Sequence, residues 1–377
     1  MKKLIIGITS EVSCSLIEGQ IRFFAENGFD VYLLVNAAKQ AEVFCEKEKC
    51  TYVPVNIKRE ISLFSDLRAL FQIIVAMRRI KPDIVNVGTP KMGLLGMIAA
   101  FVLRVPARIY TCRGFRFATS TGLIKKILVF LEKVSGACAH KIICISPSLR
   151  RKAINDGIFA EHKCVLINKG SSNGIDLSVF SKSKINPVLQ KDMRAKYALD
   201  KHFVYGFVGR ISNDKGVREL FEAFSALYEE NKSLRLFLVG RLEIETDIAE
   251  KIMKHKGVVY AGSVNKTGLP LYYSLFNVLV LPTYREGFGN VLLEAAAMGV
   301  PVVSTKVTGA VDAVNDGYNG ILVPSKNVTE LRDAMNLLYN DVNLRERYGN
   351  NGVEWAKNFD QSIIWNGMLS LYNQIIK

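Results

Sequence analysis

The sequence predicts an α/β protein made of two doubly wound domains in tandem, each with a parallel sheet covered by helices on both faces. Apolar runs of strand length alternate with amphipathic segments of helical length along the whole chain. Fully apolar strands separated by helices are typical of a parallel sheet that is buried on both faces. The 377 residues exceed one ordinary domain and suffice for two of about 150–200 residues each.

The first half of the chain contains seven strand candidates with helical stretches between them. We expect the strands at residues 4–8, 31–35, 52–57, 84–87, 109–112, 142–146 and 165–167. The helical stretches include residues 16–27, 61–79, 92–103 and 123–134. Strands that alternate with helices in this way form a parallel sheet.

A polar segment with one proline, residues 181–190, interrupts this alternation, and we expect the domain linker there. The pattern then restarts with strands expected at residues 204–208, 235–239, 258–260, 278–281, 302–304 and 321–323. A helix is expected at 217–230, because its apolar residues share one face. The predicted domains are therefore residues 1–183 and 184–358, followed by a C-terminal helix in 359–377 that can pack back on the first domain.

Composition excludes several classes of protein. With 49% hydrophobic and 23% charged residues, the chain is not disordered. Its longest uncharged apolar stretch, residues 92–103, is too short for a membrane span, which needs about twenty residues. Seven cysteines form no CxxC pair, and several lie within apolar runs. We therefore expect buried, reduced thiols and a cytoplasmic location.

The positive charge is concentrated in the first half of the chain. Residues 1–180 contain 26 Lys and Arg against 14 Asp and Glu, within a total net charge of +15. Such asymmetry indicates nucleic acid, an anionic membrane surface or an anionic ligand as partner. Apolar residues are interleaved with the basic ones: Leu63, Phe64, Leu67, Phe115, Phe117, Leu123, Ile124, Ile127 and Leu128. Either they belong to the core, or they join a surface for peripheral binding to the inner face of the plasma membrane, which we expect.

Candidate ligand-binding residues follow the ends of predicted strands, which is where ligands bind in open α/β sheets. Gly209, Arg210 and Lys215 lie between the first strand and the first helix of the second domain. Two cations beside a helix N-terminus favour an anion such as a phosphate. A solvated basic loop is the alternative, and the loop lacks the GxxxxGK[ST] pattern of a P-loop.

A second group of candidates follows the strand at residues 278–281. Glu286 and Glu294 flank a glycine-containing turn and the start of a helix, with Gly287, Phe288, Gly289, Asn290 and Val291 between them. Glycines let the backbone approach a ligand, and the helix start offers N–H groups. Because carboxylates repel phosphate, we expect the two glutamates to hold sugar and ribose hydroxyls, unless they are ordinary surface residues.

These segments resemble the family-four retaining glycosyltransferases with the GT-B fold. Glu286 and Glu294, with seven residues between them and Gly299-Val-Pro301 after them, are similar to the family's carboxylate motif. The loop from Gly209 to Gly216 is similar to its diphosphate-binding loop. Segment 173–180 resembles the family's Asn-Gly-(Val/Ile)-Asp segment, and segments 82–96 and 139–146 resemble first-domain segments of the branch that builds capsule and O-antigen polysaccharides. The resemblance implies two Rossmann-like domains facing across a cleft, the first for the acceptor and the second for the nucleotide-sugar.

The resemblance also implies roles for individual residues. Arg210 and Lys215 would hold the donor diphosphate, Glu294 the ribose and Glu286 the donor sugar, with backbone N–H groups near Phe288–Val291 completing the site. The acceptor hydroxyl would attack on the face from which the diphosphate departs, and the protein would supply positioning and charge stabilisation. The branch implies a UDP-sugar donor and a lipid-diphosphate-linked glycan acceptor.

One residue departs from the family pattern. Arg113 stands where the family often has a histidine near the donor sugar. Arginine cannot act as a base at neutral pH, so we expect Arg113 to bind an acceptor phosphate or the sugar. Further candidates for acceptor or phosphate contacts are Ser13, Ser15, Lys91 and Arg116, although a helix cap explains the two serines equally well.

No metal cofactor is expected. The chain has no Asp-x-Asp motif and no His or Cys cluster with ligand spacing, and two fixed cations can replace a metal on the diphosphate. A UDP-sugar 2-epimerase of the same architecture is the alternative enzyme. A basic nucleic-acid-binding protein fits the net charge but not the carboxylate motif, so we expect no nucleic-acid partner.

Overall fold

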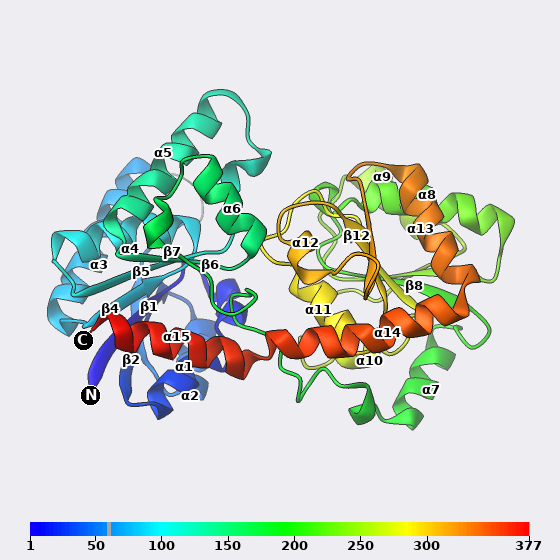
Figure 1. Cartoon of the computed structure of the whole chain (residues 1–377), viewed down its shortest axis with the longest axis horizontal. Helices are drawn as coiled ribbons and strands as arrows, with labels where there is room; N and C mark the ends of the chain where they lie inside the picture. The colour runs from blue at the N-terminus through cyan, green and yellow to red at the C-terminus, as the bar shows by residue number, and fades with distance from the viewer. Residues whose placement is uncertain (59–61, 377) are drawn as a thin grey trace. The chain divides into compact units, whose positions relative to one another are not determined.

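The computed structural model describes residues 1–58 and 62–376 and contains two compact units (Figure 1). The first unit combines residues 1–174 with the C-terminal segment from Ser362, and the second comprises residues 175–361. Each unit has one sheet in which every strand pair is parallel.

The first unit has a seven-stranded sheet with the order β3-β2-β1-β4-β5-β6-β7. Its strands are β1 (Lys2–Gly7), β2 (Phe29–Asn36), β3 (Thr51–Val55), β4 (Ile84–Val87), β5 (Ala107–Cys112), β6 (Lys141–Cys144) and β7 (Cys164–Val165). Its helices are α1 (Gln20–Glu26), α2 (Lys39–Glu48), α3 (Leu63–Ile80), α4 (Pro90–Val102), α5 (Gly122–Cys138), α6 (Pro147–Asn155) and most of α15 (Gln361–Ile375). The seven predicted strands are confirmed, with ends shifted by no more than two residues.

The helices predicted for this half differ from the observed ones by at most four residues at either end, and α5 continues to Cys138 beyond its predicted end at 134. The stretch predicted at 16–27 is a helix only from Gln20, because a 3-10 turn (Glu11–Leu16) precedes it and Gly19 caps α1 at a φ of 77°. The first residue of the helix predicted at 61–79, Ile61, lies outside the described residues.

Helices cover both faces of the first sheet. On one face α4 packs between α3 and α5. On the other face α1, α2 and α15 bury a common apolar cluster that includes Phe24, Ile364, Met368 and Tyr372. The rings of Phe24 and Tyr372 are 5.0 Å apart, and the Tyr372 hydroxyl accepts a hydrogen bond of 2.5 Å from Asn86 at the end of β4. The last helix therefore belongs to the core of the first unit.

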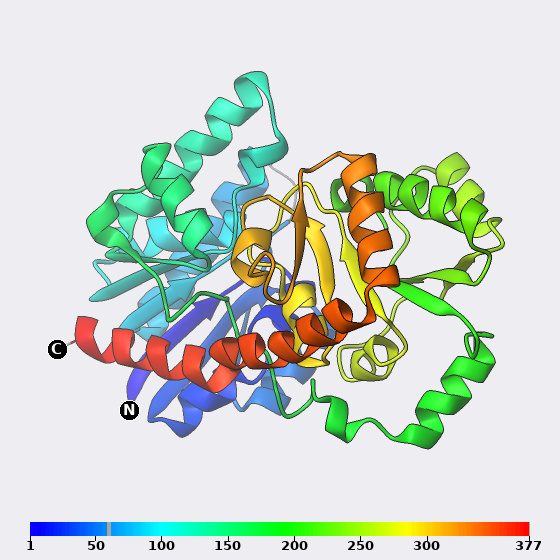
Figure 2. The same ribbon diagram turned by 45° about the vertical axis from the view of Figure 1, so that its right-hand side comes forward.

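The second unit has a six-stranded sheet with the order β10-β9-β8-β11-β12-β13. Its strands are β8 (Phe203–Val208), β9 (Leu234–Val239), β10 (Val258–Tyr260), β11 (Val278–Leu281), β12 (Val302–Thr305) and β13 (Gly320–Val323). Its helices are α7 (Pro187–Lys196), α8 (Val217–Glu230), α9 (Thr246–Met253), α10 (Leu269–Tyr273), α11 (Asn290–Ala297), α12 (Ala310–Ala313), α13 (Val328–Asn340) and α14 (Val342–Ala356). The six predicted strands are confirmed to within one residue. In Figure 2, α13 covers one face of this sheet, where it also packs on α8.

The units divide earlier than the predicted boundary at residue 183. The backbone N–H of Ile175 donates to Phe359 O at 2.7 Å, and buried Phe180 packs on Tyr273 with ring centroids 6.1 Å apart. These contacts assign residues 175–183 to the second unit. Phe359 packs on Phe288 at 5.3 Å, so the C-terminal segment of the first unit begins at Ser362 rather than at 359.

The segment expected to be a linker, residues 181–190, is partly helical. Its second part begins α7, where the Asn186 side chain accepts the backbone N–H of Val188 at 2.9 Å and Pro187 occupies the first helical position. Gln190 fixes this helix to the unit through a 2.7 Å bond to Ser274 O. The prediction of a domain linker is wrong here, because residues 175–361 form one unit and an asparagine cap followed by proline is a helix start rather than a break.

The remaining general expectations concern membrane spans and thiols. In the part of the chain that the structure describes, no helix has the length and apolarity to cross a membrane. All seven cysteines are free thiols, and five of them are buried.

Candidate active site

The two groups of donor-binding candidates meet at the middle of the second sheet. Strand β8 lies between β9 and β11, so the chain order reverses there, and ligands bind at such switch points. The backbone N–H of Tyr284 donates to Asp214 O at 2.9 Å, and the Thr283 hydroxyl donates to the same oxygen at 3.2 Å. These bonds join the loop after β8 to the loop after β11.

Gly216 makes this close approach possible, and a second glycine, Gly289, shapes the start of α11. Gly216 has a φ of 68°, and a Cβ atom there would lie 2.0 Å from Pro282 O in the neighbouring loop. Gly289 caps α11 with a φ of 82°. Both conformations are strained for any residue with a side chain. Glycine at position 216 therefore permits the contact between the two loops, and glycine at position 289 permits the observed start of α11.

Lys215 and Glu286 form a direct ion pair between Nζ and Oε1. The two side chains come from different loops and are only 17% and 15% exposed. The predicted phosphate-binding cation thus contacts the predicted sugar-binding carboxylate. A ligand that carries both a diphosphate and sugar hydroxyls can engage each partner in turn.

Arg210 is also paired with carboxylates. Its Nη1 lies 2.8 Å from Glu243 Oε2, and its Nη2 lies 2.9 Å from Asp214 Oδ2. The hydrogen bond from Arg210 lowers the pKa of Glu243, which is therefore ionised at neutral pH. Sequence reasoning missed Glu243, although it follows the end of β9, the neighbouring strand. Glu243 would have been a candidate if the residues after β9 had been considered together with those after β8 and β11, because ligands bind at the carboxyl ends of parallel strands.

Glu294 is buried near the start of α11, at 7% exposure. Desolvation by burial raises its pKa to about 7, and a hydrogen bond from the Tyr273 hydroxyl opposes this rise. That bond, 2.8 Å long to Oε2, fixes one carboxylate oxygen. Sequence analysis missed Tyr273, which is distant in sequence and comes from α10. The geometry gives Glu294 an oriented carboxyl group that can accept hydrogen bonds from hydroxyls.

The turn from Gly287 to Val291 contributes mainly backbone groups to the candidate site. Phe288 is buried at 3% exposure and packs on Phe359, so its side chain belongs to the core and its main chain alone can face a ligand. Asn290 and Val291 form the first turn of α11. The N–H groups of a first helical turn lack partners within the helix and favour an anion.

The first unit has its own switch point, between β1 and β4. The Thr9 and Thr89 hydroxyl oxygens lie 2.6 Å apart there. Arg113, after β5, donates from Nη1 to Gly88 O and from Nε to Ser172 Oγ at 3.3 Å. Burial lowers the pKa of Arg113 to about 10, so it remains a cation at neutral pH. Arg113 thus joins the end of β4 to the segment around Ser172.

The four further acceptor candidates lie in three elements of the first unit. Lys91 Nζ is 2.7 Å from Asp66 Oδ1, and this ion pair links α4 to α3. The Ser15 hydroxyl donates to Val12 O at 3.1 Å within the 3-10 turn that also contains Ser13. Arg116 is exposed at the start of the 3-10 turn Arg116–Thr119. Lys91 and Ser15 are therefore engaged by groups of their own unit.

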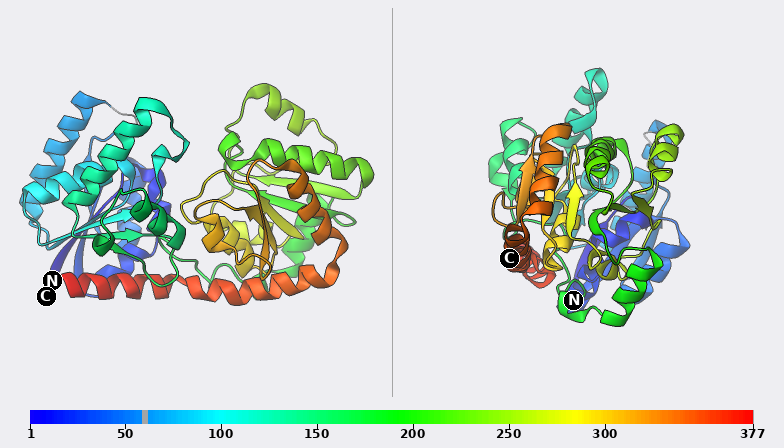
Figure 3. Two further views of the ribbon diagram at one scale, coloured as in Figure 1. Left: turned by 45° about the horizontal axis from the view of Figure 1, so that its top comes forward. Right: turned by 90° about the vertical axis from the view of Figure 1, so that its right-hand side faces the viewer.

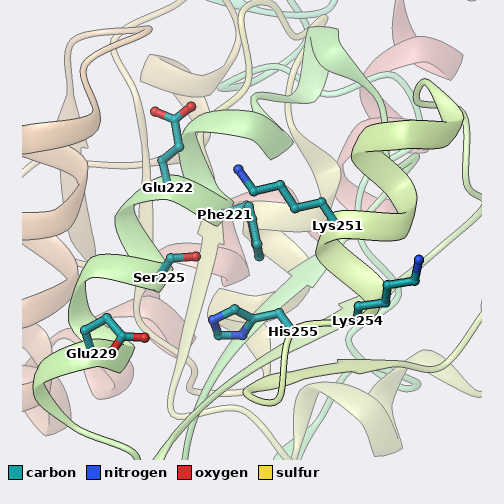
Figure 4. A pocket seen from close by; sticks show the side chains of 7 residues that line it. All are labelled: Phe221, Glu222, Ser225, Glu229, Lys251, Lys254 and His255. Carbon is teal, nitrogen blue, oxygen red and sulfur yellow. The ribbon is translucent and has the colours of Figure 1, made fainter.

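A hollow elsewhere in the second unit is separate from these residues. It lies between α8 and α9 (Figure 4) and is lined by Phe221, Glu222, Ser225, Glu229, Lys251, Lys254 and His255. Burial lowers the pKa of His255, whose ring packs edge-on against Tyr228 at 4.8 Å. Within residues 1–58 and 62–376, no three His, Cys, Asp or Glu side chains are grouped to hold a metal ion.

Comparison with known proteins identifies the family. A family model described as "Glycosyl transferases group 1" matches residues 190–355, and one described as "Glycosyl transferase 4-like domain" matches residues 17–169. The capsular polysaccharide biosynthesis glycosyltransferase CapM of Staphylococcus aureus is 38% identical over 384 aligned residues, which cover 100% of this chain and 98% of the relative.

Two further comparisons extend this result. The N,N'-diacetylbacillosaminyl-diphospho-undecaprenol alpha-1,3-N-acetylgalactosaminyltransferase of Campylobacter jejuni is 24% identical, over 85% of this chain and 84% of the relative. The crystal structure of Anabaena HepE in complex with UDP and glucose has a TM-score of 0.82 at 18% identity, over 99% of this chain and 100% of that one, and shows the same fold. The chain therefore belongs to the family-four glycosyltransferases with the GT-B fold, in the branch that builds capsule and O-antigen polysaccharides.

Proposed function

We propose that this glycosyltransferase moves a sugar from a UDP-sugar to a lipid-diphosphate-linked glycan, with retention of anomeric configuration and without a metal ion. The observation that carries the proposal is the Lys215–Glu286 pair, which joins the loops after β8 and β11 at one switch point, with Arg210 in the first loop and buried Glu294 in the helix that follows the second. The UDP and glucose bound to HepE support the donor class, and the diphospho-undecaprenol acceptor named for the Campylobacter relative supports the acceptor class.

The proposed reaction uses the site as follows. The donor diphosphate replaces carboxylates as the partner of Arg210 and Lys215, and Glu286 is then released to accept hydrogen bonds from the donor sugar. As the bond between the sugar and the diphosphate breaks, the two cations stabilise the growing negative charge. The acceptor hydroxyl attacks the same face and gives its proton to the departing phosphate oxygen. The protein contributes positioning and electrostatic stabilisation.

In the first unit, Arg113 is proposed to contact the acceptor phosphate or the donor sugar. Its guanidinium is already oriented by Gly88 O and Ser172 Oγ. An oriented guanidinium binds phosphate oxygens with little further ordering, since its donors have a fixed planar geometry. The proposed location is the cytoplasmic face of the membrane, where a peripheral protein meets a lipid-linked acceptor.

Chelation should leave activity intact. The proposal assigns the leaving-group charge to Arg210 and Lys215 rather than to a divalent cation, so excess EDTA should not change the initial rate of UDP release. Loss of turnover in EDTA that magnesium or manganese restores would contradict this account.

Replacing Glu243 should strengthen donor binding. In Glu243→Gln, Arg210 loses an anion that competes with the diphosphate, and an exposed pair of this kind contributes about 0.2–1 kcal/mol. We therefore expect the KM for the donor to fall by up to about five-fold. Glu245→Gln is the matched control, because it changes the charge equally but removes a partner of Arg218, 3.1 Å away. An equal fall in both variants would indicate a general charge effect instead.

A UDP-release screen tests the proposed function. A panel of sugar nucleotides is incubated with the full chain and a lipid-diphosphate-sugar acceptor, and the anomeric configuration of the product is read by NMR. Acceptor-dependent UDP release with retention supports the proposal. Conversion of a UDP-sugar in the absence of acceptor would favour a 2-epimerase, and inversion would overturn the retaining mechanism.

A further inference from the structure

The first unit exposes an unusual number of large apolar side chains on two of its helices. On α3 these are Leu63, Phe64, Leu67 and Phe71, and on α5 they are Leu123, Ile124, Ile127 and Phe130. Phe64 is 90% exposed, Leu63 79% and Leu123 72%. Apolar residues scattered singly on a surface are normal, but a group of this size on a monomer marks an interaction site.

Both groups lie toward the start of their helices. A helix that follows a parallel strand begins at the carboxyl edge of the sheet, so the first turns of α3 and α5 share the edge that carries Thr9, Gly88 and Arg113. The ion pair between Asp66 of α3 and Lys91 of α4 fixes α3 at this edge. Figure 3 (left) shows the starts of α3 (blue) and α5 (teal) at the same end of the unit.

Three residues of the predicted surface are not exposed. Phe115 and Phe117 are buried and stack on each other at 4.8 Å, and Leu128 is half-buried. Phe71 and Phe130, which were not among the predicted residues, belong to this surface because they are exposed on α3 and α5. The surface is therefore restricted to two helices.

The charge of the segment that contains both helices indicates what covers this surface. Residues 62–138 contain 12 Lys and Arg but only three acidic residues, Asp66, Asp83 and Glu132. Each acidic side chain is already engaged: Asp66 by Lys91, Asp83 by the backbone N–H of Lys3 at 2.7 Å, and Glu132 by the Tyr110 hydroxyl at 2.9 Å. A second copy would meet the same excess of positive charge and be repelled. The partner that fits is both apolar and anionic, as the surface of an anionic bilayer is.

We infer that α3 and α5 form a membrane-insertion surface. Leu63, Phe64 and Leu123 enter the boundary between headgroups and acyl chains, while exposed Arg68, Lys125 and Lys126 contact anionic headgroups. Insertion would hold the carboxyl edge of the first sheet at the bilayer. The inference rests on the proposed function for the identity of the lipid-linked acceptor, but the binding itself does not depend on it.

Vesicle sedimentation with the full chain tests the surface directly. The probe is vesicles of phosphatidylcholine with or without phosphatidylglycerol. Phe64→Ser with Leu123→Ser should lower the partition coefficient at least ten-fold. Val188→Ser with Leu189→Ser is the matched control, because these residues of α7 are 65% and 51% exposed but belong to the second unit; it should bind as the unchanged protein does. Lys125→Glu with Lys126→Glu should weaken binding and remove its dependence on phosphatidylglycerol and on salt.

Several outcomes would overturn the inference. Undiminished binding of the Phe64 and Leu123 variant, or an equal loss in the control, would exclude these helices as the insertion surface. Sedimentation equilibrium without vesicles tests the alternative that a second copy of the chain covers this surface. A dimer that this variant converts to a monomer would support that alternative and contradict the membrane-insertion surface. Thermal unfolding is expected to be unchanged, since the replaced side chains are exposed.

Activity measurements separate this inference from the proposed function. With a short-chain, water-soluble acceptor, the Phe64 and Leu123 variant should release UDP at the rate of the unchanged protein. With the acceptor embedded in vesicles, it should be at least ten-fold slower. Vesicle binding without UDP release from any donor and acceptor would refute the proposed function and leave the membrane surface standing.

Discussion

Replacing Arg210 with alanine should lower kcat/KM for the donor about 10- to 150-fold, the range expected from losing a charge-assisted hydrogen bond of about 1.5–3 kcal/mol. The substitution also removes one of the cations that pair with Glu243 and Asp214, although Arg241 remains beside Glu243 and Arg285 lies 4.0 Å from Asp214. Steady-state UDP release at varied donor concentration measures the effect.

The chain provides a matched control for this variant. Arg218 is 45% exposed, compared with 46% for Arg210, and also pairs with a glutamate. Arg218→Ala should leave kcat/KM nearly unchanged. Adding Glu243→Gln to Arg210→Ala should recover part of the lost activity, because it removes one of the two negative charges that lay beside the Arg210 guanidinium. A similar loss in the two arginine variants would show that Arg210 has no specific role in binding the diphosphate.

Glu286→Ala should reduce turnover by a similar factor, about 10- to 150-fold, because the hydrogen bonds lost between a carboxylate and the sugar contribute about 1.5–3 kcal/mol each. UDP affinity should remain intact or rise, since Lys215 loses its internal partner. Isothermal titration with UDP and single-turnover measurements with the UDP-sugar separate the two quantities.

Glu286→Gln is the informative second variant. It keeps the size of the side chain and one acceptor oxygen but removes the charge that pairs with Lys215. We expect UDP affinity at least equal to that of the unchanged protein and a smaller loss of turnover than in Glu286→Ala. If UDP binding fell together with turnover in both variants, Glu286 would belong to the nucleotide subsite instead of the sugar subsite.

Most of the fold was predictable because it depends on local patterns. Residues 204–208 and 278–281 form uninterrupted apolar runs, and they are the central strands β8 and β11. Residues 217–230 place their apolar side chains on one helical face, and α8 has these bounds. The order of strands along the chain then brought Arg210 and Glu286 to the same edge of the second sheet, because parallel strands end on one side.

Predictions from local composition were wrong in two places, the segment at residues 181–190 and the two phenylalanines before α5. Residues 181–190 were expected to be a linker, yet Asn186 and Pro187 start α7. Phe115 and Phe117 were expected among basic surface residues, yet their rings are buried. Burial depends on which elements pack together, and spacing within one segment does not contain that information.

The sequence by itself determined the strands, the resemblance to a glycosyltransferase family and the candidate residues for donor binding, because these follow from periodicity, strand ends and motif spacing. Only the tertiary structure decided the partners of those residues. The pairing of Lys215 with Glu286, of Arg210 with Glu243 and of Tyr273 with Glu294 joins side chains 71, 33 and 21 residues apart. Contacts between groups so distant in sequence exist only after the strands have assembled into a sheet, since loop positions depend on the packing of the whole unit.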